Sequence, residues 1–354
     1  MSNEVKLSAS RIKTAQSCTW LYWAKYKLKL PDSSNDGASR GSVCHNIFEC
    51  LGNPRHKKHY RRIIKDGDIW GCDAVTRMVT TQAKSLKVSD KENLSMINDF
   101  IMNGLRYDFF GEELGKPTKS VSEERFDIKV DEEGKRYNIL GFIDKLFLYS
   151  KKRSAIIRDF KTSKAKFKGK EATDNLQALM YSLAVKHLYP KYLQRELEFL
   201  FLKFDLEKDL LGQDGEGMLR MEKISEEELE GFEYYLTEVQ EYLENFGEEE
   251  ALSNLAAKQN YPTDGSFGGP LSCGFAKRPN QLKKDGTPMW HCTYKFPFDY
   301  LILQDPDGVK IKTAPLKDER LLEELRKEGD TITTAHYEGC PHWNKPIERD
   351  EFDL

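Results

Sequence analysis

The sequence lacks long hydrophobic runs, and no stretch approaches the ~20 consecutive apolar residues that a membrane-spanning helix needs. We therefore expect no membrane segment. The first residues, Met1 to Lys6, also lack the apolar centre of a signal peptide. Cysteine is scarce: seven residues are scattered along a chain of 354, and their odd number argues against a disulfide framework. These absences favour a cytoplasmic, reducing environment.

The net charge is also small, because 55 Lys and Arg nearly balance 58 Asp and Glu. Its distribution is more informative. Residues 151–170 carry nine Lys or Arg and one acid, and residues 54–65 carry six Lys or Arg and two His without any acid. Such separate basic stretches can bind a polyanion locally, although a solvated surface explains any single run equally well.

The order of the predicted elements indicates the fold class. Alternation of polar and apolar residues predicts strands, and a period of 3.6 predicts helices. The last strand is reached through a helix, which predicts an α/β fold around a mixed sheet. The predicted segments are a helix from residue 40, strands at 121–130, 137–149 and 155–160, a helix at 172–188, a strand at 196–204 and a helix from 225 to about 246.

The length allows one large domain or a core with a smaller lobe. We expect residues 1–210 to form the core, with a helical insertion at about 54–115. Residues 211–354 are expected to add an acidic helix and an irregular, cysteine-containing region that packs back on the core.

Two neighbouring predicted strands each end their apolar run near a carboxylate. Asp144 lies on one strand and Asp159 on the next, and Lys161 shares the side of the strand that Asp159 occupies. Buried carboxylates are costly unless they are paired or bind a cation. The three groups therefore predict a divalent-metal site with a lysine beside it, and a plain Asp159–Lys161 salt bridge is the alternative.

Two predicted helices carry further candidates. His45 and Glu49 lie one turn apart, as do Gln177 and Tyr181. A lone His on a helix is more often structural than a ligand. For Gln177 and Tyr181, the alternative is a plain helix surface or packing.

In this order, these motifs resemble the PD-(D/E)XK nuclease superfamily, specifically its RecB-like branch. That branch includes the RecB and AddB nuclease domains, the CRISPR adaptation nucleases and many phage relatives. The resemblance covers about residues 7–206 and implies a restriction-endonuclease-like core, with a central mixed sheet flanked by helices. The matching pieces are Gly41-x-x-x-His45, Gly141-Phe142-Ile143-Asp144, Asp159-Phe160-Lys161, Gln177-x-x-x-Tyr181, and an entry segment of Leu7–Arg11 with Cys18.

The resemblance implies a metal-dependent DNA nuclease, an exonuclease acting in recombination, repair or phage DNA processing. Mg²⁺ or Mn²⁺ would bind His45, Asp144, Asp159 and the backbone carbonyl of Phe160. Lys161 would orient the attacking water and stabilise developing charge.

The same resemblance gives roles to other residues. Gln177 and Tyr181 would position the DNA strand or the catalytic lysine, and Glu49 and Glu124 are secondary candidates. Single-stranded DNA or duplex ends would be the partner. Unwinding would come from a helicase or recombination protein, because the sequence has no helicase motif. The expected phosphate contacts are Arg40, Lys164, Lys166, Lys168 and Lys170.

The cysteines give a weaker indication. Some RecB-like nucleases hold a [4Fe–4S] cluster between one N-terminal and three C-terminal cysteines, which implies Cys18, Cys273, Cys292 and Cys340 here. The closely spaced C-terminal triplet is missing. A zinc site that includes His291 or His342, or buried cysteines without any metal, are the alternatives.

Two other functions stay open. One is a non-catalytic nucleic-acid-binding or complex-assembly module on the same fold, and the other is an enzyme that acts on another phosphate ester. The intact acids and lysine favour catalysis, because a pure binding module has no need of them.

Overall fold

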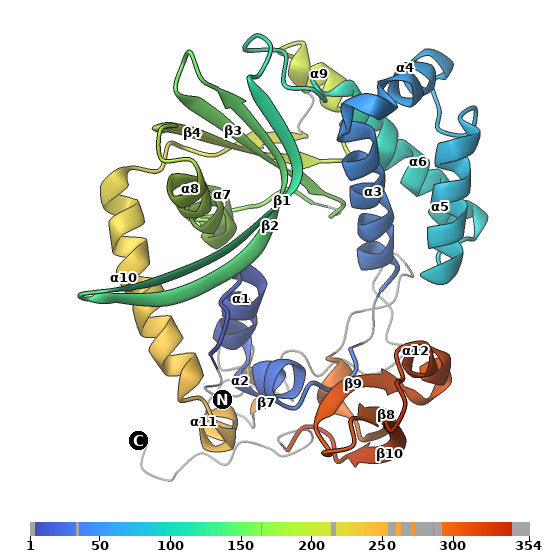
Figure 1. Cartoon of the computed structure of the whole chain (residues 1–354), viewed down its shortest axis with the longest axis vertical. Helices are drawn as coiled ribbons and strands as arrows, with labels where there is room; N and C mark the ends of the chain where they lie inside the picture. The colour runs from blue at the N-terminus through green and yellow to red at the C-terminus, as the bar shows by residue number, and fades with distance from the viewer. Residues whose placement is uncertain are drawn as a thin grey trace. The chain divides into compact units, whose positions relative to one another are not determined.

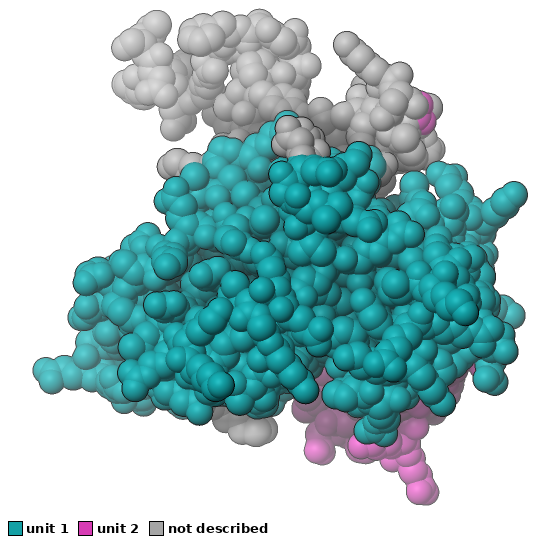
Figure 2. All heavy atoms as spheres, turned by 90° about the horizontal axis from the view of Figure 1, so that it is seen from above, with its two compact units in different colours: residues 1–9, 34–241 teal, residues 10–33, 242–354 magenta. Residues whose placement is uncertain are grey.

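A computed structural model describes residues 4–32, 35–163, 165–213, 217–253, 260–262, 271–273, 286 and 292–341. The chain divides into two compact units, and both are discontinuous in sequence (Figures 1 and 2). The first unit consists of residues 1–9 and 34–241, and the second of residues 10–33 and 242–354.

A five-stranded sheet forms the centre of the first unit (Figure 1). Its strands follow the order β1-β2-β3-β4-β5, and all neighbours are antiparallel except the parallel pair β3 and β4. A parallel pair requires a crossover, and helix α8 lies in that connection. The predicted mixed sheet is confirmed. The strands are β1 (Lys119–Glu132), β2 (Lys135–Tyr149), β3 (Ser154–Lys161), β4 (Gln194–Phe201) and β5 (Met218–Arg220).

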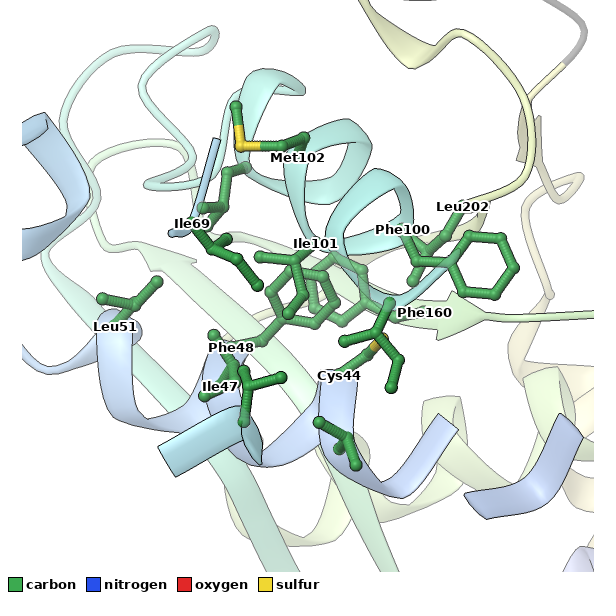
Figure 3. Packing of buried hydrophobic residues seen from close by; sticks show 14 of the residues in the cluster. Cys44, Ile47, Phe48, Leu51, Ile69, Phe100, Ile101, Met102, Phe160 and Leu202 are labelled. Carbon is green, nitrogen blue, oxygen red and sulfur yellow. The ribbon is translucent and has the colours of Figure 1, made fainter. Parts of the chain in front are cut away.

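Helix α3 packs its apolar face against the sheet and neighbouring helices (Figure 3). Ile47 and Leu51 lie one turn apart on this face and are fully buried. The ring of Phe48 stacks on that of Phe160, with 4.3 Å between centroids, and so holds α3 against β3. The helices of this unit are α3 (Asp36–Gly52), η2 (Pro54–His56), α4 (Lys57–Asp66), α5 (Asp73–Ser85), α6 (Lys91–Arg106), α7 (Lys170–Thr173), α8 (Leu176–Leu188), α9 (Leu206–Leu210) and α10 (Glu226–Glu244), which continues into the second unit.

The helix predicted at 172–188 is interrupted. The short helix α7 ends at Thr173, and α8 begins only at Leu176. Asn175 caps α8, because its side-chain oxygen accepts hydrogen bonds from the backbone N–H groups of Gln177 and Ala178. Its amide also donates to the backbone oxygen of Glu171. The break therefore fixes the first turn of α8, which carries Gln177.

The second unit contains a three-stranded antiparallel sheet, where the sequence analysis expected an irregular region. Its order is β10-β8-β9, and residues 300–303 of the central strand are buried. No helix in the described part of the chain is both long and apolar enough to cross a membrane. The elements are α1 (Ala9–Ser17), α2 (Thr19–Tyr22), the π-helix η1 (Trp23–Lys27), α11 (Glu248–Ser253), β6 (Asn260–Pro262), β7 (Leu271–Cys273), η4 (Thr293–Lys295), β8 (Phe298–Gln304), β9 (Lys310–Pro315), η5 (Leu316–Asp318), α12 (Glu319–Glu323) and β10 (Thr331–Tyr337).

Candidate metal centre

The two predicted carboxylates lie where β2 and β3 separate. Pairing between these strands ends at Lys145 and Arg158, one residue short of Asp144 and Asp159. Beyond that point the two strands are linked by a side chain and not by backbone hydrogen bonds. Oδ2 of Asp144 accepts a hydrogen bond of 2.7 Å from the backbone N–H of Phe160. The opening of the sheet thus exposes backbone groups of β3 beside two acids.

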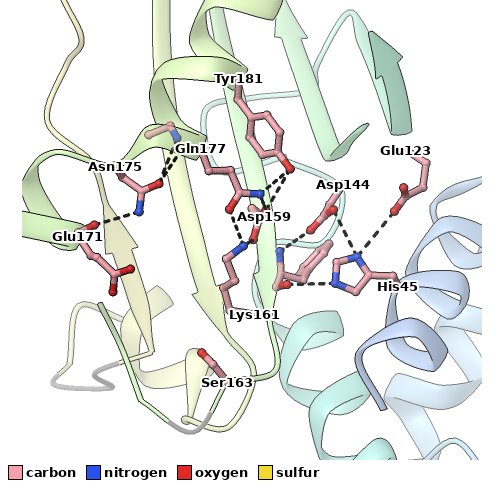
Figure 4. A network of polar contacts seen from close by, with 12 residues as sticks. His45, Glu123, Asp144, Asp159, Lys161, Ser163, Glu171, Asn175, Gln177 and Tyr181 are labelled. Carbon is pink, nitrogen blue, oxygen red and sulfur yellow. Dashed lines mark hydrogen bonds and ion pairs between the residues drawn. The ribbon is translucent and has the colours of Figure 1, made fainter. Parts of the chain in front are cut away.

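His45 reaches this opening from α3 (Figure 4). Its Nδ1 lies 3.3 Å from Oδ1 of Asp144, and its Nε2 lies 3.1 Å from the backbone oxygen of Phe160. Gly41, one turn earlier on α3, permits this helix to approach the end of β3 closely, since a Cβ at Gly41 would lie 3.0 Å from Oγ1 of Thr162. The structure therefore places His45, Asp144 and the Phe160 carbonyl side by side, and their role as metal ligands stays a prediction.

Glu123 also lies beside His45 and Asp144, although its place in the sequence did not single it out. Its Oε1 lies 3.8 Å from Nδ1 of His45, and Glu123, His45 and Asp144 can offer ligand atoms within 4.8 Å of one another. Its φ of 51° is in the left-handed region, which is uncommon for a residue other than glycine. Pairing of β1 with β2 is interrupted at Glu123, between Ser122 and Glu124. The secondary candidate Glu124 instead accepts a hydrogen bond from Tyr189.

The catalytic lysine candidate belongs to a network with three partners (Figure 4). Nζ of Lys161 lies 2.7 Å from Oδ2 of Asp159 and donates to Oε1 of Gln177 at 2.8 Å. The Gln177 amide donates to Oδ1 of Asp159 at 2.7 Å, and the Tyr181 hydroxyl lies 3.3 Å from the same oxygen. Gln177 and Tyr181 thus hold the carboxylate and the ammonium in place from α8.

Burial and like charges perturb the titration of this centre. Burial lowers the pKa of His45, but the hydrogen bonds to Asp144 and Glu123 outweigh it and raise that pKa to about 10. Burial raises the pKa of Asp159 to about 6, and the charge of Asp144 contributes to the rise. The carboxylates therefore attract positive charge, which a divalent cation can supply.

The residues fit a divalent cation. Oδ2 of Asp159 is buried and lacks a hydrogen bond within the described chain, although the Lys161 ammonium lies beside it. Carboxylate and carbonyl oxygens suit Mg²⁺ and Mn²⁺, and an added imidazole makes Mn²⁺ more favourable. His45 and Glu123 also line a surface hollow of about 410 Å³, which gives solvent and ligands access.

The predicted phosphate contacts are only partly described. The Arg40 guanidinium donates to Oδ1 of Asn93 on α6. Lys166 is half-buried and Lys168 is exposed. Lys164 and the side chain of Lys170 lie outside the described residues, so a role for this basic run stays a prediction.

Three of the four predicted cluster cysteines have described side chains in the second unit: Cys18 is buried, and Cys292 and Cys340 are half-buried. The Sγ of Cys18 accepts a hydrogen bond from the backbone N–H of Leu21. The backbone of Cys273 belongs to β7, but its side chain lies outside the described residues. His291 and His342 also lie outside them.

Comparison with known proteins agrees with this geometry. A family model described as the PD-(D/E)XK nuclease superfamily matches residues 6–277, which is more than half of the chain. No curated protein matches the sequence. The match includes all four strand and helix motifs of the candidate centre, and the mixed sheet with flanking helices is consistent with the restriction-endonuclease-like fold of that family. The chain therefore belongs to the PD-(D/E)XK nuclease superfamily.

Proposed function

We propose that the protein is a Mg²⁺- or Mn²⁺-dependent DNA exonuclease of the RecB-like branch, which serves recombination, repair or phage DNA processing. One observation carries the proposal: His45, Asp144 and the Phe160 carbonyl converge at the opening between β2 and β3, with Asp159 and Lys161 beside them. Superfamily membership supports a nuclease that acts on nucleic acid and uses divalent metal.

His45, Asp144, Asp159 and the Phe160 carbonyl would hold the cation, with Glu123 as a further ligand or a hydrogen-bond partner of His45. A divalent cation bound there would acidify a water molecule and neutralise charge on the scissile phosphate. Side chains of the protein would position the water molecule and the phosphate.

Lys161 would orient the water and stabilise the charge that develops on the phosphate. Its ammonium is held by Asp159 and Gln177, so it has one defined position instead of many rotamers. Tyr181 contacts the same carboxylate and is buried, which makes it a positioning residue.

Substituting the lysine tests the proposal. Purified protein with Mg²⁺ or Mn²⁺ should degrade end-labelled linear DNA and leave closed circular DNA intact. Lys161→Ala should lower the rate by about 100- to 1,000-fold, because a preorganised charge is lost from the transition state. Lys116→Ala is the control, since Lys116 is exposed and lies in the loop before β1. Equal rates for wild type and Lys161→Ala would refute the catalytic role.

The same assay separates the alternatives. Binding of DNA without cleavage, independent of metal, would favour a non-catalytic module. Cleavage of circular DNA would replace the exonuclease with an endonuclease, and turnover of nucleotides but not of polymers would indicate another phosphate ester as substrate.

We also propose that Cys18, Cys292 and Cys340, together with Cys273, bind a metal centre in the second unit. All four cysteines belong to one compact unit, where Cys18 is buried and Cys292 and Cys340 are half-buried. A ligand set of thiolates suits either a [4Fe–4S] cluster or zinc, and metal analysis would distinguish the two.

A further inference from the structure

The hollow beside the metal centre continues along α3. Asn46 and Glu49 line both the hollow that contains His45 and a second hollow of about 450 Å³. The second hollow extends to His56 at the end of η2 and to Gln82 on α5. The two hollows share these lining residues and therefore adjoin along α3 from His45 to His56, and we refer to the two together as the groove.

Helix α4, which directly follows the groove residue His56 in the chain, carries a basic stripe. Lys58, Arg61, Arg62 and Lys65 are all exposed, and their spacing of three and four residues places them on one face, over ~10 Å of helix. The opposite face buries Ile63. The ring of His59 stacks on that of the groove residue His56. Burial lowers the pKa of His59, and the positive charges of Lys58, His56 and Arg62 lower it further.

This charge pattern opposes the stability of the helix. Lys58 and Arg62, and likewise Arg61 and Lys65, are like charges one turn apart, which destabilises a helix. The first turn has no acidic residue, so its cations face the positive end of the helix dipole. Within the described chain, Arg62 pairs with Asp66 at 3.5 Å, whereas Lys58, Arg61 and Lys65 form no ion pair. The charges of the stripe therefore do not stabilise α4 itself.

We propose that the basic stripe of α4 binds the phosphate backbone of the nucleic-acid substrate and that the groove along α3 guides the strand from there to the metal centre. The inference deepens the proposed function, because a strand bound on α4 would reach His45 through the groove. A polyanion would also relieve the repulsion between neighbouring cations, which links binding to helix stability.

Salt dependence of binding tests the stripe directly. Affinity for labelled single-stranded and duplex DNA is measured in EDTA at several salt concentrations, so the result does not depend on hydrolysis. Lys58→Gln/Lys65→Gln should lower the slope of log affinity against log salt by about 1.4 for single strands and about 1.8 for duplex, since two phosphate contacts are lost.

A matched control variant is Lys116→Gln/Lys223→Gln, which removes two exposed lysines outside both basic stretches and should leave the slope unchanged. Arg61→Gln/Arg62→Gln should lower the slope by the same amount as Lys58→Gln/Lys65→Gln. The Lys58→Gln/Lys65→Gln variant should melt at the same temperature as wild type or higher, because repulsion is relieved, whereas Arg61→Gln/Arg62→Gln also removes the Arg62–Asp66 pair.

The outcomes separate this inference from the proposed function. An unchanged slope for both α4 variants, an equal fall for the control, or no DNA binding by wild type would overturn the inference. Cleavage by wild type and its loss in Lys161→Ala would still support the nuclease. Conversely, a selective fall in slope would support the α4 surface even if no cleavage occurs.

Discussion

A single residue with an unusual backbone conformation brings a further carboxylate to the candidate metal centre. The left-handed φ of Glu123 costs free energy, and such strain persists where the surrounding structure imposes it. We expect Glu123→Gln to weaken Mn²⁺ binding by about 10- to 100-fold, the usual range for a group that supports a metal ligand. Calorimetric titration of the purified protein with Mn²⁺ measures this affinity.

The neighbouring Glu124 provides the control. It has the same chemistry but contacts Tyr189, so Glu124→Gln should leave Mn²⁺ affinity unchanged. If both variants bind Mn²⁺ as wild type does, Glu123 is no part of the centre. If both weaken binding alike, the effect arises from the distortion of β1 and not from the carboxylate of Glu123.

The residues of this centre differ in how far the sequence could predict them. Period-two alternation places Asp159 and Lys161 on the same side of one strand, whereas His45 is indicated by the resemblance of Gly41-x-x-x-His45 to the family motif. Glu123 could not be predicted, because alternation on β1 does not reveal where its pairing with β2 is interrupted. Glu124, the secondary candidate, contacts Tyr189, and its role stays a prediction.

At the scale of elements, Glu233 on α10 ties that helix to β2 and α8. Its Oε1 accepts a hydrogen bond of 2.7 Å from Tyr137, and its Oε2 lies 3.2 Å from Nζ of Lys135. Lys186 on α8 lies 3.8 Å from the same Oε2. Burial raises the pKa of Glu233, but the contacts with Tyr137 and Lys135 outweigh it and hold that pKa below its usual value of 4.5.

We expect Glu233→Gln to lower the free energy of unfolding at pH 7 by about 1–3 kcal/mol, since a charged hydrogen-bond acceptor is lost from a buried position. Because the folded-state pKa of Glu233 lies below 4.5, its carboxylate stabilises the protein fully above pH 4.5. This stabilisation is lost as the pH falls through the folded-state pKa. The difference between wild type and variant should therefore vanish in acid.

Urea unfolding of both proteins across this pH range measures the difference. Glu230→Gln on the same helix is the control, because Glu230 is exposed and its change should stay within about 0.5 kcal/mol. A difference that persists unchanged below the folded-state pKa would show that Gln disturbs the packing and that the charge is not the cause.

The elements themselves were largely predictable, and their ends were less so. Strands β1 to β4 and helix α8 follow from hydrophobic periodicity. The break before α8 depends on Asn175, whose cap competes with helix continuation. The strand β5 has only three residues, which is too short to show an alternating pattern. It is recognised by its antiparallel pairing with β4.

At the scale of the whole molecule, each compact unit is assembled from two separate segments of the chain. Residues 10–33 belong with residues 242–354, and within that unit Trp20 donates to the hydroxyl of Tyr337 at 2.8 Å. Periodicity reports only local structure, so it cannot reveal which distant segments share a core. The fold of the sheet could be inferred from the order of its elements, whereas this long-range association could not.

The proposed thiolate centre gives the last prediction, because it would join the two segments of the second unit. A metal that binds the folded state alone stabilises it by mass action, and more so when its ligands are distant in sequence. We expect anaerobically purified protein to contain iron with labile sulfide, or zinc. Cys340→Ala should lose that metal and unfold at a lower temperature, whereas Cys50→Ala, in the first unit, should retain both properties. Wild-type protein without iron or zinc would show that these cysteines serve packing alone.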